Sequence, residues 1–92
     1  MRYSKNNEHS LKLRAWLRNK RQEGDFSLRE LAKRLDSSHP VLVRIENGDR
    51  SLGILEFVEY CDALDIDPKE GLEILLSSIK SSEDHLVYDI KI

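Results

Sequence analysis

Apolar residues recur three and four positions apart through most of this chain, which is the spacing of helices that bury one face. Leu13, Trp16 and Leu17 form the first such stripe, and many of the residues between and after them are Lys or Arg. We expect this first helix to end near Glu23, because the turn-forming residue Gly24 follows it.

Two short helices are predicted next, joined by a tight turn. Ser27 and Glu30 have the spacing of a capping box, in which each side chain satisfies a backbone N–H at the start of a helix, so we expect a helix over residues 27–35. The polar residues 36–38 then interrupt the apolar pattern. A third helix is predicted over residues 39–47, where the apolar spacing resumes.

The second half of the chain predicts two further helices and a terminal strand. The fourth helix is expected to bury an apolar set made of Ile54, Phe57, Val58, Cys61 and Leu64. The fifth begins at Pro68, and its expected apolar face consists of Leu72, Leu75, Leu76 and Ile79. From Leu86 to Ile92 apolar and other residues alternate, which predicts a short C-terminal β-strand.

A chain of 92 residues has enough apolar surface for one core and not for two. We therefore expect one all-α domain of five helices over residues 1–80, followed by a C-terminal tail over residues 81–92 that carries the strand.

The net charge of −2 conceals a polarised distribution. Residues 1–52 contain 12 Lys and Arg against 7 Asp and Glu, a net charge of +5, whereas residues 53–92 contain 3 against 10, a net charge of −7. A basic front half would turn towards a polyanion, and an acidic back half would keep the domain soluble. The same asymmetry also fits two faces that are simply solvated.

Several function classes lack the residues they need. No apolar run approaches the roughly 20 residues that span a bilayer, and the first residues lack the apolar stretch of a signal peptide, so we expect a cytoplasmic protein without a membrane partner. Cys61 is the only cysteine and is interpreted as a core thiol. It has no metal-ligand spacing with His9, His39 or His85, and the adjacent residues 36–39 cannot adopt the geometry of a catalytic triad. We expect no metal, no cofactor and no enzymatic activity.

The two short helices and their turn match a helix-turn-helix, whose second helix can enter a DNA major groove. Residues 26–35, together with Ser38, residues 44–48 and Arg50, resemble the lambda-repressor-like, Xre-type family of DNA-binding domains. The most specific part is the joint spacing of Leu31-Ala32 and Ile45-Glu46-Asn47-Gly48, and the resemblance covers the chain from about Leu13 to Leu76.

The resemblance implies that the helix after the turn reads bases in double-stranded DNA. It assigns contacts with DNA to seven residues: Ser27, Ser38, His39, Val41, Arg44, Asn47 and Arg50. Arg44 and His39 fall at base-contacting positions, where a guanidinium can pair with guanine, and a valine can touch a thymine methyl group. The other four fall at phosphate-contacting positions. The resemblance also implies that Glu46 pairs with Arg21 inside the domain.

Four apolar residues depart from the pattern of that family: Leu28, Pro40, Val41 and Val43. They would form an apolar patch on the face expected to meet DNA, and Pro40 would make the third helix begin one residue late. The leading hypothesis is a sequence-specific transcriptional regulator, a repressor that occupies its operator. Two alternatives remain open: the DNA-binding antitoxin of a toxin and antitoxin pair, whose partner would dock on the acidic half, and a protein-binding module that keeps the fold without binding DNA.

The predicted tail strand also bears on assembly. A lone strand leaves its backbone N–H and C=O groups unpaired, and the nearest available strand is the same segment of a second subunit. Antiparallel self-pairing of residues 86–92 therefore predicts a symmetric homodimer. The competing interpretation is that the tail packs on the helices of its own chain.

Overall fold

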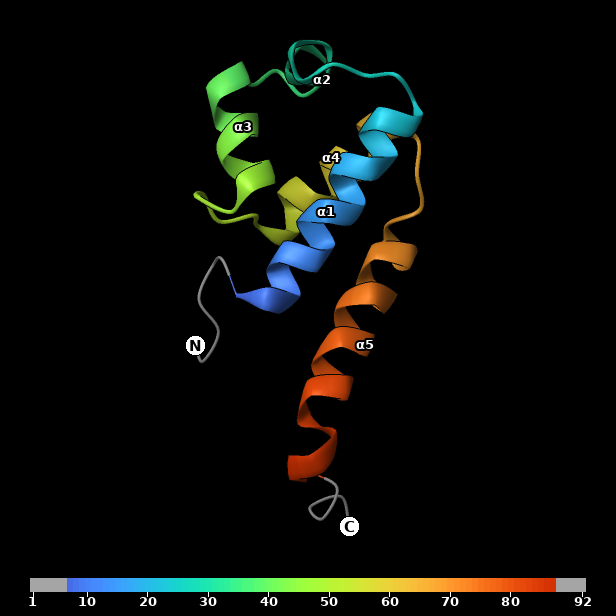
Figure 1. Ribbon diagram of the computed structural model, residues 1–92. Coiled ribbons are helices and arrows are strands. Elements are labelled where there is room, and N and C mark those ends of the chain that lie inside the picture. The colour runs from blue at the N-terminus through green and yellow to red at the C-terminus, as the bar shows by residue number, and fades with distance from the viewer. Residues whose placement is uncertain (1–6, 88–92) are drawn as a thin grey trace.

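The computed structural model describes the backbone of residues 7–87 and the side chains of residues 7–81, and all regular structure in that part of the chain is helical. Figure 1 shows the five helices in chain order: α1 (Glu8–Glu23), α2 (Leu28–Arg34), α3 (His39–Asn47), α4 (Ile54–Leu64) and α5 (Pro68–Val87). This order confirms the predicted all-α architecture. None of the described helices combines the length and the apolar composition that crossing a membrane requires.

Side-chain caps define where α2 and α3 begin. The Ser27 hydroxyl accepts a hydrogen bond from the Glu30 N–H at 3.1 Å, and the Glu30 carboxylate accepts one from the Ser27 N–H at 3.0 Å, which confirms the capping box. These hydrogen bonds lower the pKa of Glu30. The prediction that Pro40 delays α3 was wrong, because α3 begins at His39 behind the cap Ser38. Proline is tolerated there because N–H groups in the first turn have no partner within the helix.

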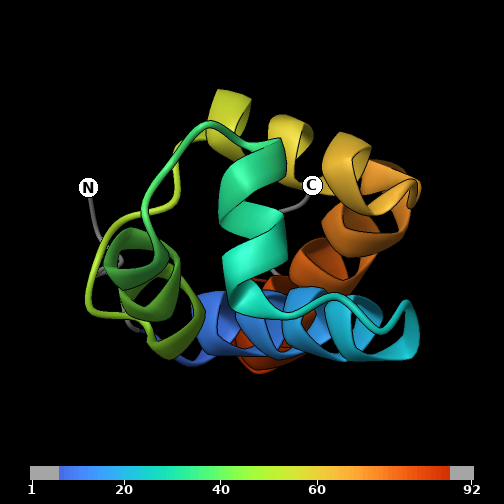
Figure 2. The same cartoon turned by 90° about the horizontal axis from the view of Figure 1, so that it is seen from above.

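α1 is the central element of the fold. It contacts α3, α4 and α5, while α2 packs on α3 and α4. Figure 1 places α3 and α5 on opposite sides of α1, and these two helices do not contact each other within the described residues. In the view from above, α3 lies beside the start of α1 (Figure 2). The core between the helices consists of Leu13, Leu17, Leu31, Ala32, Leu42, Ile45, Phe57, Tyr60, Cys61 and Leu64. Cys61 is fully buried, as predicted, and burial raises its pKa to about 11.

The predicted apolar faces of α4 and α5 were partly wrong. Ile54 is 64% exposed and Val58 is 45% exposed, whereas Tyr60, which was missing from the predicted set, is fully buried. On α5, Leu72 and Leu76 point outward, with Leu76 64% exposed. Both helices carry more apolar residues than one buried face can hold, so periodicity alone could not select the inner ones.

The predicted C-terminal strand was wrong at its first two residues, which are helical. Leu86 and Val87 belong to the last turn of α5, so no strand begins at Leu86. Propagating an existing helix adds one hydrogen bond for each residue fixed, and a strand at this point would need a separate partner. The rest of the predicted strand, residues 88–92, lies outside the described part of the chain.

Gly71 allows α5 to approach α1 closely. A Cβ atom at this position would lie 2.6 Å from Cζ3 of Trp16 and 3.0 Å from Cζ of Phe57. The Trp16 and Phe57 rings themselves pack at a tilt, with their centroids 6.4 Å apart. Trp16 is half-buried and packs against the core, as expected of a residue in the first apolar stripe. Gly71 therefore gives the indole ring the space it occupies between α1 and α5.

We expect Gly71→Ala to destabilise the domain by about 1–3 kcal/mol, because the added methyl group must displace Trp16 or the α5 backbone. Urea unfolding followed by circular dichroism measures this effect. In a Trp16→Leu background the shortest contact is relieved and the 3.0 Å approach to Cζ of Phe57 remains, so the same substitution should destabilise the domain less than it does in the wild type. Equal destabilisation in both backgrounds would contradict the assignment of Gly71 to the indole contact.

Candidate nucleic-acid interface

α2 and α3 are joined by a turn with a defined backbone conformation. Ser37 donates its N–H to the Ala32 carbonyl oxygen at 2.9 Å, and Asp36 adopts a positive φ of 52°. This left-handed residue turns the chain out of α2, and α3 begins three residues later at His39. The inner face of α3 carries the buried residues Leu42 and Ile45, which makes the opposite face available to a partner.

Arg44 and Asn47 are exposed on the outer face of α3. Within the described residues, no hydrogen bond or ion pair engages the Arg44 guanidinium. The Asn47 side-chain oxygen accepts the Asp49 N–H at 3.4 Å, which leaves its NH2 group available as a donor. Gly48 closes the helix with a positive φ of 86°. The end of α3 thus presents the Arg44 guanidinium and the Asn47 amide, and the Gly48 cap fixes the backbone that carries them.

The two predicted serines lie at the N-termini of α2 and α3. Ser27 accepts the N–H of Glu30, and Ser38 accepts the N–H of Val41 at 3.4 Å. Both side chains are exposed, and a capping hydroxyl still has its own proton to donate. Two helix N-termini with exposed hydroxyl donors suit the oxygen atoms of a phosphate group.

His39 and Val41 are less accessible than the other predicted contacts. Both are half-buried, and Val41 packs against the core together with Leu28. Val43 is also half-buried, so of the four apolar residues that depart from the family pattern only Pro40 is exposed. The apolar patch expected on this face is therefore smaller than the sequence suggested.

Two cations that the predicted site left out lie beside α3. Arg29 and Lys33 are exposed on α2, and with His39 they line a shallow depression of about 410 Å³. They stand four positions apart, so they share one face of α2. The four-residue spacing of these two cations, just before the turn, was the feature of the sequence that could have added them to the predicted site.

Arg50 lies in the loop after α3 and is the one predicted contact whose charge is paired. Its Nη2 atom is 3.3 Å from Oε2 of Glu56, and both side chains are exposed, at 45% and 42%. The other oxygen of Glu56 accepts the Gly53 N–H at 3.0 Å and so caps α4. The Arg50 backbone N–H bonds to the Arg44 carbonyl oxygen at 3.2 Å.

The carboxylate of Glu46 is buried and ties α3 to α1, as predicted. Arg21 donates from Nε to Oε2 of Glu46 at 2.7 Å and from Nη2 to Oε1 at 3.0 Å. The side chains are 12% and 5% exposed. Arg18 adds a third connection, since its Nη2 atom donates to the Glu46 backbone oxygen at 3.1 Å and its Nε atom lies 3.5 Å from Oε1. The hydrogen bonds to Glu46 raise the pKa of Arg21.

Two more buried polar groups complete this network. Tyr60 of α4 donates its hydroxyl proton to Oε2 of Glu46 at 2.8 Å, and burial, with the nearby carboxylate, raises the pKa of this tyrosine. Arg14 donates from Nη1 to the Ile45 backbone oxygen, and burial lowers its pKa. One carboxylate on α3 thus collects donors from α1 and α4, which fixes how α3 is oriented on the domain.

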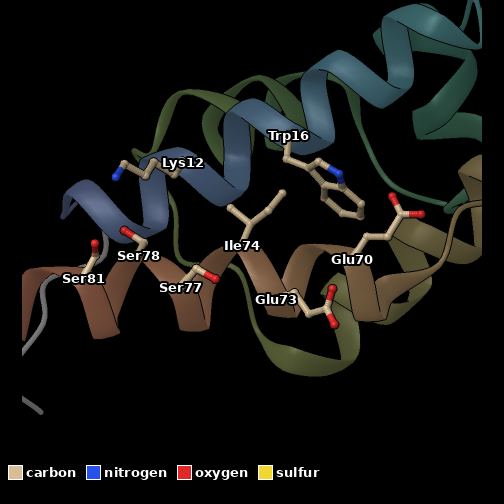
Figure 3. A pocket seen from close by; sticks show the side chains of 8 residues that line it. All are labelled: Lys12, Trp16, Glu70, Glu73, Ile74, Ser77, Ser78 and Ser81. Carbon is tan, nitrogen blue, oxygen red and sulfur yellow. The ribbon is translucent and has the colours of Figure 1, made fainter. Parts of the chain in front are cut away.

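A second concave surface lies away from α3, between α1 and α5. Figure 3 shows this open groove of about 550 Å³, with Trp16 and Ile74 at its centre and Lys12 towards one end. Ser78, which lines the groove, is largely buried, and its hydroxyl oxygen lies 2.7 Å from Nδ1 of the buried His9. Among the described residues, no three His, Cys, Asp or Glu side chains gather where a metal ion could bind.

Comparison with known proteins agrees with this geometry. The sequence profile of the helix-turn-helix family matches residues 17–70. Two crystal structures of the clp gene regulator ClgR from Corynebacterium glutamicum superpose with a TM-score of 0.69 each. One is 26% identical and covers 78% of this chain and 94% of its own; the other is 23% identical, covers 94% of both chains and shows the fold alone. No curated protein matches the chain.

We expect Glu46→Gln to lower the free energy of unfolding by about 3–5 kcal/mol, because it leaves the Arg21 guanidinium, which is only 12% exposed, without its counter-charge. Tyr60→Phe removes only one hydrogen bond to the same carboxylate and should cost about 1 kcal/mol. Urea titration measures the free energy of unfolding of both variants and of the wild type. A Glu46→Gln variant as stable as Tyr60→Phe would contradict a central role for this carboxylate.

Proposed function

Because the chain belongs to the helix-turn-helix family, in its lambda-repressor-like form, we propose that it is a sequence-specific regulator of transcription that inserts α3 into the major groove of double-stranded DNA. One observation carries the proposal: Arg44 is exposed and has no partner among the described residues, on a helix whose inner side is held by the buried Glu46 network. An arginine held on a rigid element is suited to bidentate recognition of guanine.

The residues around Arg44 support contact with phosphates. Ser27 and Ser38 present hydroxyl donors at two helix N-termini, and Arg29, Lys33 and Arg50 add exposed cations. Donors of this kind set the register of a protein on the duplex, while base contacts supply specificity. We assign His39, Arg44 and Val41 to the groove, and Val41 makes the smallest contribution because it packs partly on the core.

The similar solved structure of higher identity is that of a gene regulator, which favours a regulatory role for this chain as well. Occupying an operator is the simplest mode of action for a domain this small, so we propose repression. The exposed cations on α2 and in the loop after α3 favour this function over a protein-binding module without DNA. An antitoxin role would use the same DNA face and an additional partner on the acidic half.

We also propose that the protein acts as a homodimer, with α5 as the pairing surface. Leu72 and Leu76 are exposed on this helix, and Glu73 and Lys80, also exposed, share the face of Leu76 at helical spacing. An antiparallel crossing at Leu76 would pair Leu76 with its own copy and bring Glu73 close to Lys80 of the partner subunit, so the face is complementary to itself. Symmetric dimers of helix-turn-helix domains read half-sites about 34 Å apart, which is why a dimer suits the proposed function.

Binding to DNA is tested by selecting a site from randomised duplexes and measuring affinity for the selected and a random sequence. Arg44→Ala should reduce discrimination at one base pair by about 1–3 kcal/mol, whereas Arg50→Ala should weaken binding to both sequences and leave the preferred base at each position unchanged. Fluorescence anisotropy at several salt concentrations provides the affinities. Wild-type binding that is absent, or that does not change with salt, would refute the proposed function, since phosphate contacts make affinity fall steeply as salt rises.

The dimer is tested by Leu76→Glu, which should convert the protein to a monomer in sedimentation equilibrium without changing its circular dichroism, since Leu76 lies outside the core. Leu11→Glu on α1 is the matched control, because that leucine is also exposed. If both variants stay dimeric, or if the wild type is monomeric at concentrations at which it binds DNA, α5 is not the pairing surface.

A further inference from the structure

The ion pair between Arg50 and Glu56 stands at the edge of the face proposed to meet DNA. Arg50 and Glu56 line a shallow depression of about 800 Å³ together with Ile54 and Arg44, the arginine proposed to read bases. Within the described residues, Arg44 carries an unpaired guanidinium and Arg50 a paired one. The Arg44 charge is therefore available to a polyanion, whereas the Arg50 charge is partly neutralised by Glu56.

Glu56 is held in place independently of Arg50. Its Oε1 atom accepts the Gly53 N–H at 3.0 Å as part of the cap of α4, which leaves Oε2 directed at Nη2 of Arg50 at 3.3 Å. The loop itself is fixed at the other end, because the Arg44 carbonyl oxygen accepts the N–H groups of Asp49 and Arg50. The cap of α4 therefore holds the carboxylate near Arg50 without depending on the ion pair.

Resting on the DNA-binding function proposed above, we propose that Glu56 is a specificity-determining positioning residue that acts through Arg50. It neutralises the guanidinium in the free protein and competes with phosphates for it. An exposed ion pair is weak, so a phosphate in the correct register can displace the carboxylate. Random DNA, which binds through charge alone, gains less from Arg50 than it would from an unpaired arginine. Glu56 thus lowers non-specific affinity while Arg44 continues to read bases.

The test measures binding of a random-sequence duplex to wild-type protein and to Glu56→Gln between 50 and 200 mM salt. Glutamine keeps an oxygen that can cap Gly53 and removes the charge that pairs with Arg50. Releasing one arginine charge adds about one phosphate contact, so the slope of log K against log salt should steepen by about 0.9. The affinity lost between the two salt concentrations should then grow about threefold relative to the wild type.

Two controls separate this role from a general loss of negative charge. Glu59→Gln removes the same charge one turn later on α4, where the exposed glutamate makes no ion pair within the described residues, so it should leave the slope unchanged. In an Arg50→Gln background, Glu56→Gln should no longer steepen the slope. Equal shifts for the two glutamate variants, or an undiminished effect without Arg50, would overturn this inference while DNA binding by the wild type still supports the proposed function. A wild type that binds no duplex would overturn both.

Discussion

The buried carboxylate of Glu46 is the contact on which the arrangement of the helices depends. It accepts hydrogen bonds from Arg21 on α1 and Tyr60 on α4, while Arg18 binds the backbone oxygen of the same residue. A buried charge is costly unless its oxygens are satisfied, and here several donors satisfy them. Because these donors lie on different helices, α3 can satisfy its carboxylate in one orientation only. The pose of the proposed recognition helix is thus set by electrostatics as well as by apolar packing.

The sequence was most informative where a physical rule links residues at short range. The Ser27 and Glu30 capping box acts over one helical turn, so its spacing was sufficient to place the start of α2. The pairing of Arg21 with Glu46 was also predicted, although from a family resemblance, because spacing along the chain does not determine distance in space. Tyr60 and Arg18 were missed for that reason, since nothing local to either residue identifies Glu46 as its partner.

Other differences arise where local patterns are ambiguous. Ile54 and Val58 belong to an apolar stripe as regular as that of Phe57 and Cys61, and only the position of the neighbouring helices decides which of these residues is buried. Gly71 is unfavourable for helix formation in the sequence, yet the close approach of Trp16 requires it. For the candidate site, Arg44 and Asn47 were named from the family resemblance and are exposed on α3, whereas the pairing of Arg50 depends on a loop whose path the sequence does not specify.

The division of α3 into two sides has a consequence for engineering. Its inner side carries Leu42, Ile45 and Glu46, which hold the domain together, and its outer side carries Pro40, Arg44 and Asn47, which take no part in the core. Substitutions on the outer side therefore leave the folding free energy nearly unchanged, while each one alters the groups that face a partner. This helix can serve as a cassette: randomising its three outer positions yields a library of folded variants from which new DNA-binding preferences can be selected without redesigning the scaffold.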